Sequence, residues 1–204
     1  MFVVLKKEII NSLLAGVLIS IGGTVFLNCQ EKVVGAFLFS VALIFICAES
    51  LSLYTGKICY FPEKTNKKFS FELLCCLLGN IFSTYLCAFF LKLNHLNLHT
   101  AADLACNLKL NKSPLQIFTD AFFCGILIYL AVNFYKKNKS IFGILVCIPV
   151  FILCGFEHCI ADVFYFSLSS INNMARIFSF ILIAIIGNSA GGMFIPFVKK
   201  IAGK

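Results

Sequence analysis

The chain has 204 residues, of which 60% are hydrophobic and 13% charged, with a mean hydropathy of +0.97 and a formal net charge of +8. This composition excludes a soluble domain, in which apolar residues make up about half of the chain and charged residues about a quarter. Because the lysines fall in short clusters between apolar runs, we interpret the basic excess as a signal of membrane topology and expect no nucleic-acid partner.

Six apolar stretches are long enough to cross a lipid bilayer, which takes about 20 residues per helix. They cover residues 9–28, 33–61, 71–92, 115–135, 141–168 and 177–198. With six crossings both termini lie on one side, and most lysines fall in the segments on that side. The positive-inside rule therefore predicts a multi-pass protein of the inner (cytoplasmic) membrane with both termini in the cytoplasm. We expect one channel domain over residues 1–204.

Two of these stretches, 33–61 and 141–168, are too long for one simple crossing and carry polar residues in their second halves. The polar segments are AESLSLYTGK at 48–57 and GFEHCIAD at 155–162. Irregular backbone at membrane depth is tolerated only where protein buries it or where it lines a polar cavity. We therefore predict two helices that break inside the membrane and share one pathway.

The sequence also repeats itself. LAGVLISIGGTVF, which starts at Leu14, resembles FCGILIYLAVNF, which starts at Phe123, and two further pairs follow in the same order at nearly the same separation. These pairs are Glu49 with Glu157, and the LLGN and IIGN segments that end at Asn80 and Asn188. Three spans per half predict a three-plus-three inverted repeat, with halves at about 1–92 and 115–204 joined by an outside segment at 93–114. Such folds place the substrate site where the repeats meet.

These motifs resemble the formate/nitrite transporter family of small-anion channels, which includes hydrosulfide channels. The strongest piece is GFEHCIADVF at 155–164; the others are AGVLISIGG at 15–23, SLYTG at 52–56, LLGN at 77–80, GIL at 125–127 and GNSAGG at 187–192. The resemblance implies an all-α, aquaporin-like fold with six transmembrane helices per protomer, a homopentamer in the lipid bilayer, and one pore through each protomer.

His158 is the first candidate for the functional site. An ionisable group at membrane depth is costly and marks function by default, and imidazole exchanges a proton near neutral pH. His95 and His99 fall in the outside segment, where we expect a solvated loop. The hydroxyl of Thr55, in the other break, can donate to an anion or to the imidazole. The resemblance implies that this threonine faces His158 from a mobile loop.

The resemblance also places constrictions on either side of this polar centre. They fall on Phe39, Leu43 and Leu53 in the second span, Val132 in the fourth and Phe151 in the fifth. Every one of these residues is apolar, as a gate that excludes water requires.

Other polar residues are expected to support the breaks. An unpaired buried charge at Glu157 would be expensive, so we expect this residue to be protonated or held by backbone donors and to orient its loop. Glu49 is expected to do the same in the other half. We expect Asn80 and Asn188 to cap or bridge helices rather than to touch substrate.

The chain departs from the family pattern at several positions. Tyr129, Lys57 and Asp162 replace asparagines, Val163 replaces a methionine, and Ser113 stands where the vestibule lysine is expected, with Lys112 one residue away. We expect Lys57 and Lys112 together to restore the positive field of the vestibule. These departures favour a substrate such as hydrosulfide, nitrite or a short carboxylate.

The sequence predicts a channel for small monovalent weak-acid anions, protonated transiently at His158 between two apolar constrictions. We expect no enzyme activity, no cofactor and no metal. One alternative is an aquaporin-like facilitator of small neutral solutes, although the chain has no Asn-Pro-Ala triplet. Another is a membrane metalloenzyme with Glu49, Glu157, His158 and Asp162 as ligands, but no second His or Cys stands at ligand spacing around His158.

Overall fold

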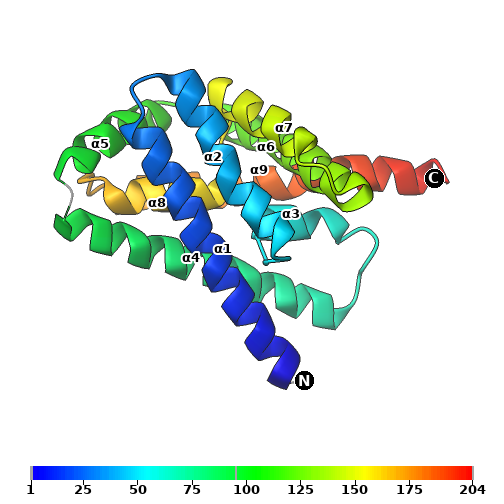
Figure 1. The fold of residues 1–204 in the computed structure, drawn as a ribbon. Coiled ribbons are helices and arrows are strands. Elements are labelled where there is room, and N and C mark those ends of the chain that lie inside the picture. The colour runs from blue at the N-terminus through cyan, green and yellow to red at the C-terminus, as the bar shows by residue number, and fades with distance from the viewer. Residues whose placement is uncertain (1, 95, 204) are drawn as a thin grey trace.

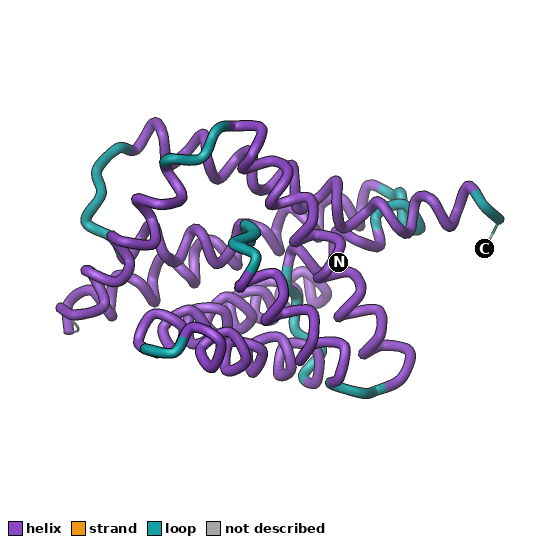
Figure 2. Tube along the Cα trace, turned by 90° about the horizontal axis from the view of Figure 1, so that it is seen from above, coloured by secondary structure: helices purple, strands orange, loops and turns teal. Residues whose placement is uncertain are grey.

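The computed structural model describes residues 2–94 and 96–203, and its regular structure is helical, with no strand in these ranges (Figure 2). Four helices are long and apolar enough to cross a bilayer. They are α1 (Phe2–Asn28), α4 (Lys67–Asn94), α6 (Pro114–Asn138) and α9 (Met174–Ile201). The expectation of an all-α fold is confirmed for the described part of the chain.

The two remaining apolar stretches are each divided into shorter helices. In the first, α2 (Lys32–Ala48) is followed by α3 (Tyr54–Lys57) and the 3₁₀ helix η1 (Ile58–Tyr60). In the second, α7 (Phe142–Leu153) is followed by α8 (Cys159–Leu168). The helices are thus interrupted within the polar segments that the sequence singled out.

Both interruptions use the same backbone geometry. Ser50 and Gly155 have left-handed φ angles of 53° and 69°. The N–H of Leu51 donates to the carbonyl of Ile46 at 2.8 Å, and the N–H of Phe156 donates to the carbonyl of Phe151 at 3.0 Å. This is the Schellman end of a helix, in which a left-handed residue turns the chain and satisfies the last carbonyls.

The first interruption is held by Asn80, from the middle of α4. Its Oδ1 accepts a hydrogen bond from the N–H of Tyr54 at 2.8 Å. Its Nδ2 donates to the carbonyls of Ser12 at 2.7 Å and Ser52 at 3.0 Å. One buried amide therefore ties α1 and α4 to the start of α3 and satisfies backbone groups that have no helical partner.

Asn188, in α9, makes the equivalent set of bonds at the second interruption. Its Oδ1 accepts from the N–H of Cys159 at 2.8 Å, and its Nδ2 donates to the carbonyls of Ala121 and Glu157, each at 2.8 Å. The two asparagines thus bridge helices and touch the same backbone positions of their respective breaks.

This correspondence corrects the register of the internal repeat. The hydrogen bonds make Ser52, not Glu49, the counterpart of Glu157. Glu49 follows α2 as its C-terminal cap, and its side chain is exposed and forms no ion pair with the described residues. The pairing of two glutamates in the sequence was a coincidence of spacing, because Cys154 occupies the place of Glu49 at the end of α7.

The helices pack so that the short segments lie between the long ones. α1 packs against α2 and α4, and α6 packs against α7 and α9 (Figure 1). α8 packs on α4, and η1 packs on α9, so each half of the chain covers the segment that follows the break of the other half. A Cβ added at Gly191 would lie 1.8 Å from the carbonyl oxygen of Phe122, so the close contact of α6 and α9 requires glycine there.

The segment between the halves is a helix rather than the expected solvated loop. α5 covers Leu96–Leu110 and buries Leu98, Ala102 and Cys106 on one face. His99 lies in this helix, is half-buried, and its Nε2 is 3.1 Å from the carbonyl oxygen of Lys92. His95 lies outside the described residues. The i, i+4, i+8 spacing of the buried residues is the amphipathic signal that the asparagines of this segment obscured.

We predict that Asn80→Ala and Asn188→Ala each lower the free energy of unfolding by about 3 kcal/mol, because each leaves one backbone N–H and two carbonyls unsatisfied in the interior. Asn138→Ala is the matched control, since Asn138 is exposed and donates only to the carbonyl of Phe134 in its own helix. Thermal unfolding of the purified protein in detergent measures the effect. Equal midpoints for all three variants would contradict the structural role of the two asparagines.

Candidate functional site

Thr55 and His158 meet at the centre of the fold. Thr55 lies in α3, directly after the first interruption, and His158 is the N-terminal cap of α8, directly after the second. The Thr55 Oγ1 and His158 Nε2 atoms are 2.9 Å apart. The residues are 0% and 3% exposed, so their polar atoms are largely removed from water. The structure therefore brings together the two polar residues that the sequence assigned to separate breaks.

The hydrogen bonds of His158 determine where the neutral ring carries its proton. The N–H of Ala161 donates to His158 Nδ1 at 3.2 Å, so Nδ1 holds a lone pair. The proton of the neutral imidazole then sits on Nε2 and is donated to Thr55 Oγ1. This arrangement leaves the hydroxyl hydrogen of Thr55 to donate to another acceptor. It also means that a fully charged ring must give up the bond from Ala161.

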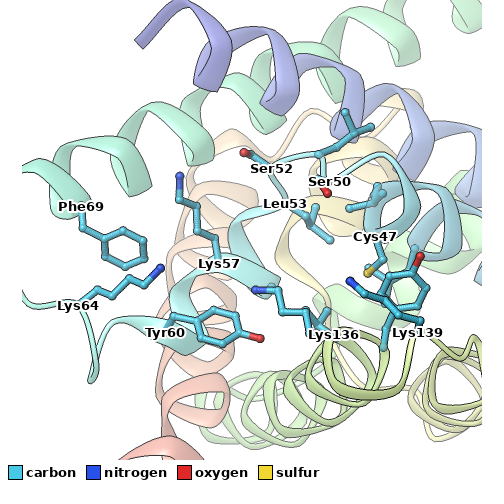
Figure 3. Close-up of a pocket in the computed structure, with 16 residues that line it drawn as sticks. Cys47, Ser50, Ser52, Leu53, Lys57, Tyr60, Lys64, Phe69, Lys136 and Lys139 are labelled. Carbon is cyan, nitrogen blue, oxygen red and sulfur yellow. The ribbon is translucent and has the colours of Figure 1, made fainter. Parts of the chain in front are cut away.

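Two cavities flank this pair. The histidine cavity, of about 340 Å³, is lined by His158, Phe39, Phe151, Lys109, Glu157 and other residues. The lysine cavity, of about 370 Å³, is lined by Leu43, Leu53, Val132, Tyr60, Lys64, Lys136 and other residues (Figure 3). Gly56, next to Thr55 in the chain, also lines the lysine cavity. The Thr55–His158 pair therefore lies between a cavity that His158 lines and one that begins beside Thr55.

The five apolar residues expected at constrictions divide between the cavities. Phe39 and Phe151 line the histidine cavity, whereas Leu43, Leu53 and Val132 line the lysine cavity. All five are buried. The rings of Phe39 and Phe151 meet edge to face with centroids 6.4 Å apart, and Phe151 stacks on His158 at 5.9 Å. Apolar side chains thus stand on both sides of the polar pair.

Glu157 is held by two lysines rather than by the backbone donors or the proton that we expected. Its Oε1 lies 2.6 Å from Lys112 Nζ, and its Oε2 contacts Lys109 Nζ. Lys109 also pairs with Asp162 at 2.9 Å. Burial opposes the charge of Lys109, but the carboxylates of Asp162 and Glu157 outweigh it and raise the pKa of Lys109 above its ordinary value. The backbone of Glu157 is still fixed, through Asn188.

Lys109 is the residue of this site that sequence reasoning missed. It lies near the end of α5, three positions before Lys112, in a segment we had expected to be irregular. Two features of the sequence could have indicated Lys109: the KLNK spacing at 109–112, and the acidic Asp162 where the family pattern has an amide. If the segment had been expected to be helical, the spacing of three residues would have indicated that Lys109 and Lys112 lie on nearly the same side. In the structure α5 ends just before Lys112, and both lysines contact Glu157.

Lys57 and Lys112 do not share one vestibule. Lys57 lines the lysine cavity and pairs with Glu8 at 2.7 Å and Glu72 at 3.4 Å. Lys112 lines the histidine cavity and pairs with Asp120 at 2.6 Å as well as with Glu157. Carboxylates accompany both ammonium groups, so the expectation that they jointly create a positive field is wrong.

The remaining departures from the family pattern have separate surroundings. The Ser113 hydroxyl accepts a hydrogen bond from the N–H of Gln116 at 3.3 Å and caps α6. Tyr129 is buried in α6, with Lys199 Nζ 5.9 Å from its ring centroid, and lines neither cavity. Across residues 2–94 and 96–203, no three His, Cys, Asp or Glu side chains are grouped so that they could hold a metal ion.

A family model described as formate/nitrite transporter matches residues 3–200 of the chain. The chain therefore belongs to the formate/nitrite transporter family, which confirms the resemblance seen in its motifs. The long apolar helices and this membership define a multi-pass membrane protein of a family of channels, not an enzyme.

Solved structures show the same fold. An FNT family ion channel is similar with a TM-score of 0.83 and 19% identity, over 98% of this chain and 89% of that one. A pentameric formate channel with formate bound is similar with a TM-score of 0.80 and 20% identity, over 98% of each chain. The search of curated proteins finds no match.

We predict that Lys109→Met destabilises the protein by about 3 kcal/mol, because it leaves Asp162 without its partner. Adding Asp162→Asn to this variant restores most of the loss, since it removes the buried charge. Lys7→Met is the control, because Lys7 is exposed and forms no ion pair with the described residues.

Thermal unfolding in detergent measures the stability of Lys109→Met, of the double variant and of the Lys7→Met control. Because the pKa of Lys109 is raised, its contribution to stability is present below the pKa of an unfolded lysine and is lost only as the pH rises through the higher folded value. Wild type should therefore remain more stable than Lys109→Met throughout the range from about pH 6 to about pH 9. A double variant no more stable than Lys109→Met would contradict the assignment.

Proposed function

We propose that the chain is a channel that carries small monovalent weak-acid anions, such as formate, nitrite or hydrosulfide, across the cytoplasmic membrane. The observation that carries this proposal is the hydrogen bond between Thr55 and His158, buried between two cavities and flanked by apolar side chains. A pentameric formate channel with the same fold supports a small anion as substrate and a homopentamer as the assembly.

The proposed topology has six crossings in a three-plus-three inverted repeat. The crossings are α1, α2 with α3, α4, α6, α7 with α8, and α9. The matching hydrogen bonds of Asn80 and Asn188 support the repeat, because equivalent amides hold equivalent backbone positions. Both termini lie in the cytoplasm on the side of the lysine cavity, and α5 lies outside beside the histidine cavity. Lipid and neighbouring copies cover the exposed apolar side chains.

The barrier to an anion is its charge. Between Phe39 and Phe151 on one side and Leu43, Leu53 and Val132 on the other, an anion loses hydration that the apolar side chains do not replace. The cost for a bare ion amounts to several kcal/mol or more. A neutral acid of the same size loses far less. Protonation between the constrictions is therefore the step that opens the path.

His158 and Thr55 supply that step. The Thr55 hydroxyl, which accepts the Nε2 proton, donates its own hydrogen to the anion and holds it at the centre. A proton taken from water at Nδ1 makes the ring an imidazolium, and transfer of the Nε2 proton to the anion through the Thr55 hydroxyl leaves a neutral ring protonated on Nδ1. The resting tautomer returns when Nδ1 gives its proton to water and Nε2 takes one up. The acid then crosses the second constriction uncharged and releases its proton to water. Charging Nδ1 requires the bond from Ala161 to open, so the start of α8 moves with the proton.

We predict that formate flux into proteoliposomes rises as the pH falls and that His158→Ala lowers it roughly tenfold or more, because a positioned acid or base contributes at least this much to proton transfer. Thr55→Val, which keeps the shape and removes the hydroxyl, lowers the flux but preserves some of its pH dependence. His99→Ala is the control, since His99 lies in α5 and lines neither cavity.

The same vesicles are tested with nitrite, hydrosulfide, chloride and glycerol. Flux of weak-acid anions that depends on His158 supports the proposal and identifies the substrate. Flux of glycerol alone, or anion flux that is indifferent to His158, would overturn the mechanism and favour a facilitator of neutral solutes.

A further inference from the structure

The lysine cavity is lined by three lysines that form no ion pair with a carboxylate of the described chain, although Glu63 lies near enough to Lys136 to favour its charge. Lys64, Lys136 and Lys139 all line it, and none of them forms an ion pair with residues 2–94 or 96–203. Lys57 differs, because it turns to Glu8 and Glu72. The histidine cavity differs too, since its lysines pair with carboxylates. The unbalanced charge is therefore confined to one end of the pathway.

Lys64, Lys136 and Lys139 are exposed residues, but their ammonium groups gather at the mouth of one cavity. Figure 3 shows the ammonium groups of Lys64 and Lys136 pointing toward each other, while Lys57 points away. The Lys136 Nζ atom lies 3.6 Å from the ring centroid of Tyr60. Like charges held around one cavity repel each other and focus a positive potential inside it. Such a cluster is stabilised by an anion placed among its members.

Tyr60 adds a second, independent feature. Its hydroxyl is buried and has no hydrogen-bond partner among the described residues, although Tyr60 lines the same cavity. A buried polar group without a partner is costly and normally indicates an unseen ligand or water. Three ammonium groups and this hydroxyl therefore line one cavity as donors with no hydrogen-bond acceptor among the described residues.

The missing ligand must be rich in oxygen acceptors and carry more than one negative charge. A formate-sized monovalent anion would leave most of the lysine charge unbalanced and would fill little of the 370 Å³ cavity. A phosphate group carries a charge of about −1.5 to −2 near pH 7 and several strong acceptor oxygens. Lysine binds phosphate as a flexible point charge and needs no planar alignment.

We propose that the lysine cavity binds a phosphate-bearing, multivalent anion, and that its occupation blocks the channel. The block rests on the proposed function, whereas the binding does not. Leu43, Leu53 and Val132 line the same cavity, and a phosphate dianion cannot follow the substrate past them. The cost of removing an ion from water rises with the square of its charge, and a single proton from the Thr55–His158 pair would not neutralise it.

Binding is tested first, with inorganic pyrophosphate and the purified full-length protein in neutral detergent. Isothermal titration should show saturable binding that formate at equal ionic strength does not reproduce. Lys64→Gln/Lys139→Gln should weaken this binding about tenfold or more, because two charges are removed from the cavity. Lys67→Gln/Lys68→Gln removes the same charge from exposed positions that do not line the cavity, and should leave binding unchanged. Equal loss in both double variants, or no binding by wild type, would overturn the proposal.

Flux measurements then test the block and the source of the phosphate. Pyrophosphate on the side of the lysine cavity should slow formate flux in phosphatidylcholine vesicles, and the Lys64→Gln/Lys139→Gln variant should resist it. If vesicles that also contain phosphatidic acid abolish the pyrophosphate effect, the site takes a lipid headgroup; if the effect persists, it takes a soluble phosphate.

The two proposals fail in different ways. Lysine-dependent pyrophosphate binding without any anion flux would remove the channel function and leave the binding site. If His158-dependent flux is not slowed by pyrophosphate, or is slowed equally in the Lys64→Gln/Lys139→Gln variant, the block is removed and the channel function is left.

Discussion

A helix that breaks inside a membrane protein must satisfy its freed backbone groups within the protein, because lipid offers them no partner. Asn80 and Asn188 do this with one amide each. Asn188 fixes the backbone on both sides of His158, and Asn80 fixes the backbone just before Thr55. The left-handed residues Ser50 and Gly155 end the preceding helices in the same way at both breaks. The positions of Thr55 and His158 therefore depend on a backbone arrangement made twice, and their 2.9 Å separation is its consequence.

The charges on either side of this pair are arranged differently. In the histidine cavity Lys109 and Lys112 are matched by Glu157, Asp162 and Asp120, a network that supports the second break. In the lysine cavity three ammonium groups have no such partners among the described residues, so the cavity's potential attracts anions toward the apolar side chains beside Thr55. The same field that raises the local concentration of a permeant anion would hold a multivalent one that cannot pass. The proposed conduction and the proposed block are thus two consequences of one charge distribution.

Sequence reasoning identified the parts of this site that are local. Polar residues inside long apolar stretches indicated both breaks. His158 followed from its ionisable ring at membrane depth, whereas Thr55 was chosen among several polar residues of its break because the family resemblance implied that it faces the histidine. It failed where side chains meet across the fold. Glu49 and Glu157 looked equivalent by spacing, yet the backbone bonds pair Glu157 with Ser52. Lys109 was overlooked because its segment read as a loop, although α5 places it against Glu157 and Asp162.

The central claim is that substrate is protonated between the constrictions and crosses the second one as a neutral acid, and it is tested most directly by comparing nitrite with nitrate in the same proteoliposomes. The two anions are similar in size and charge, but only nitrite has a conjugate acid weak enough to form near neutral pH. The account predicts that nitrite crosses, faster at lower pH, while nitrate is excluded from pH 5 to 8. Nitrate flux equal to nitrite flux would show that an unprotonated anion passes between Phe151 and Leu53, and would contradict the role given to His158.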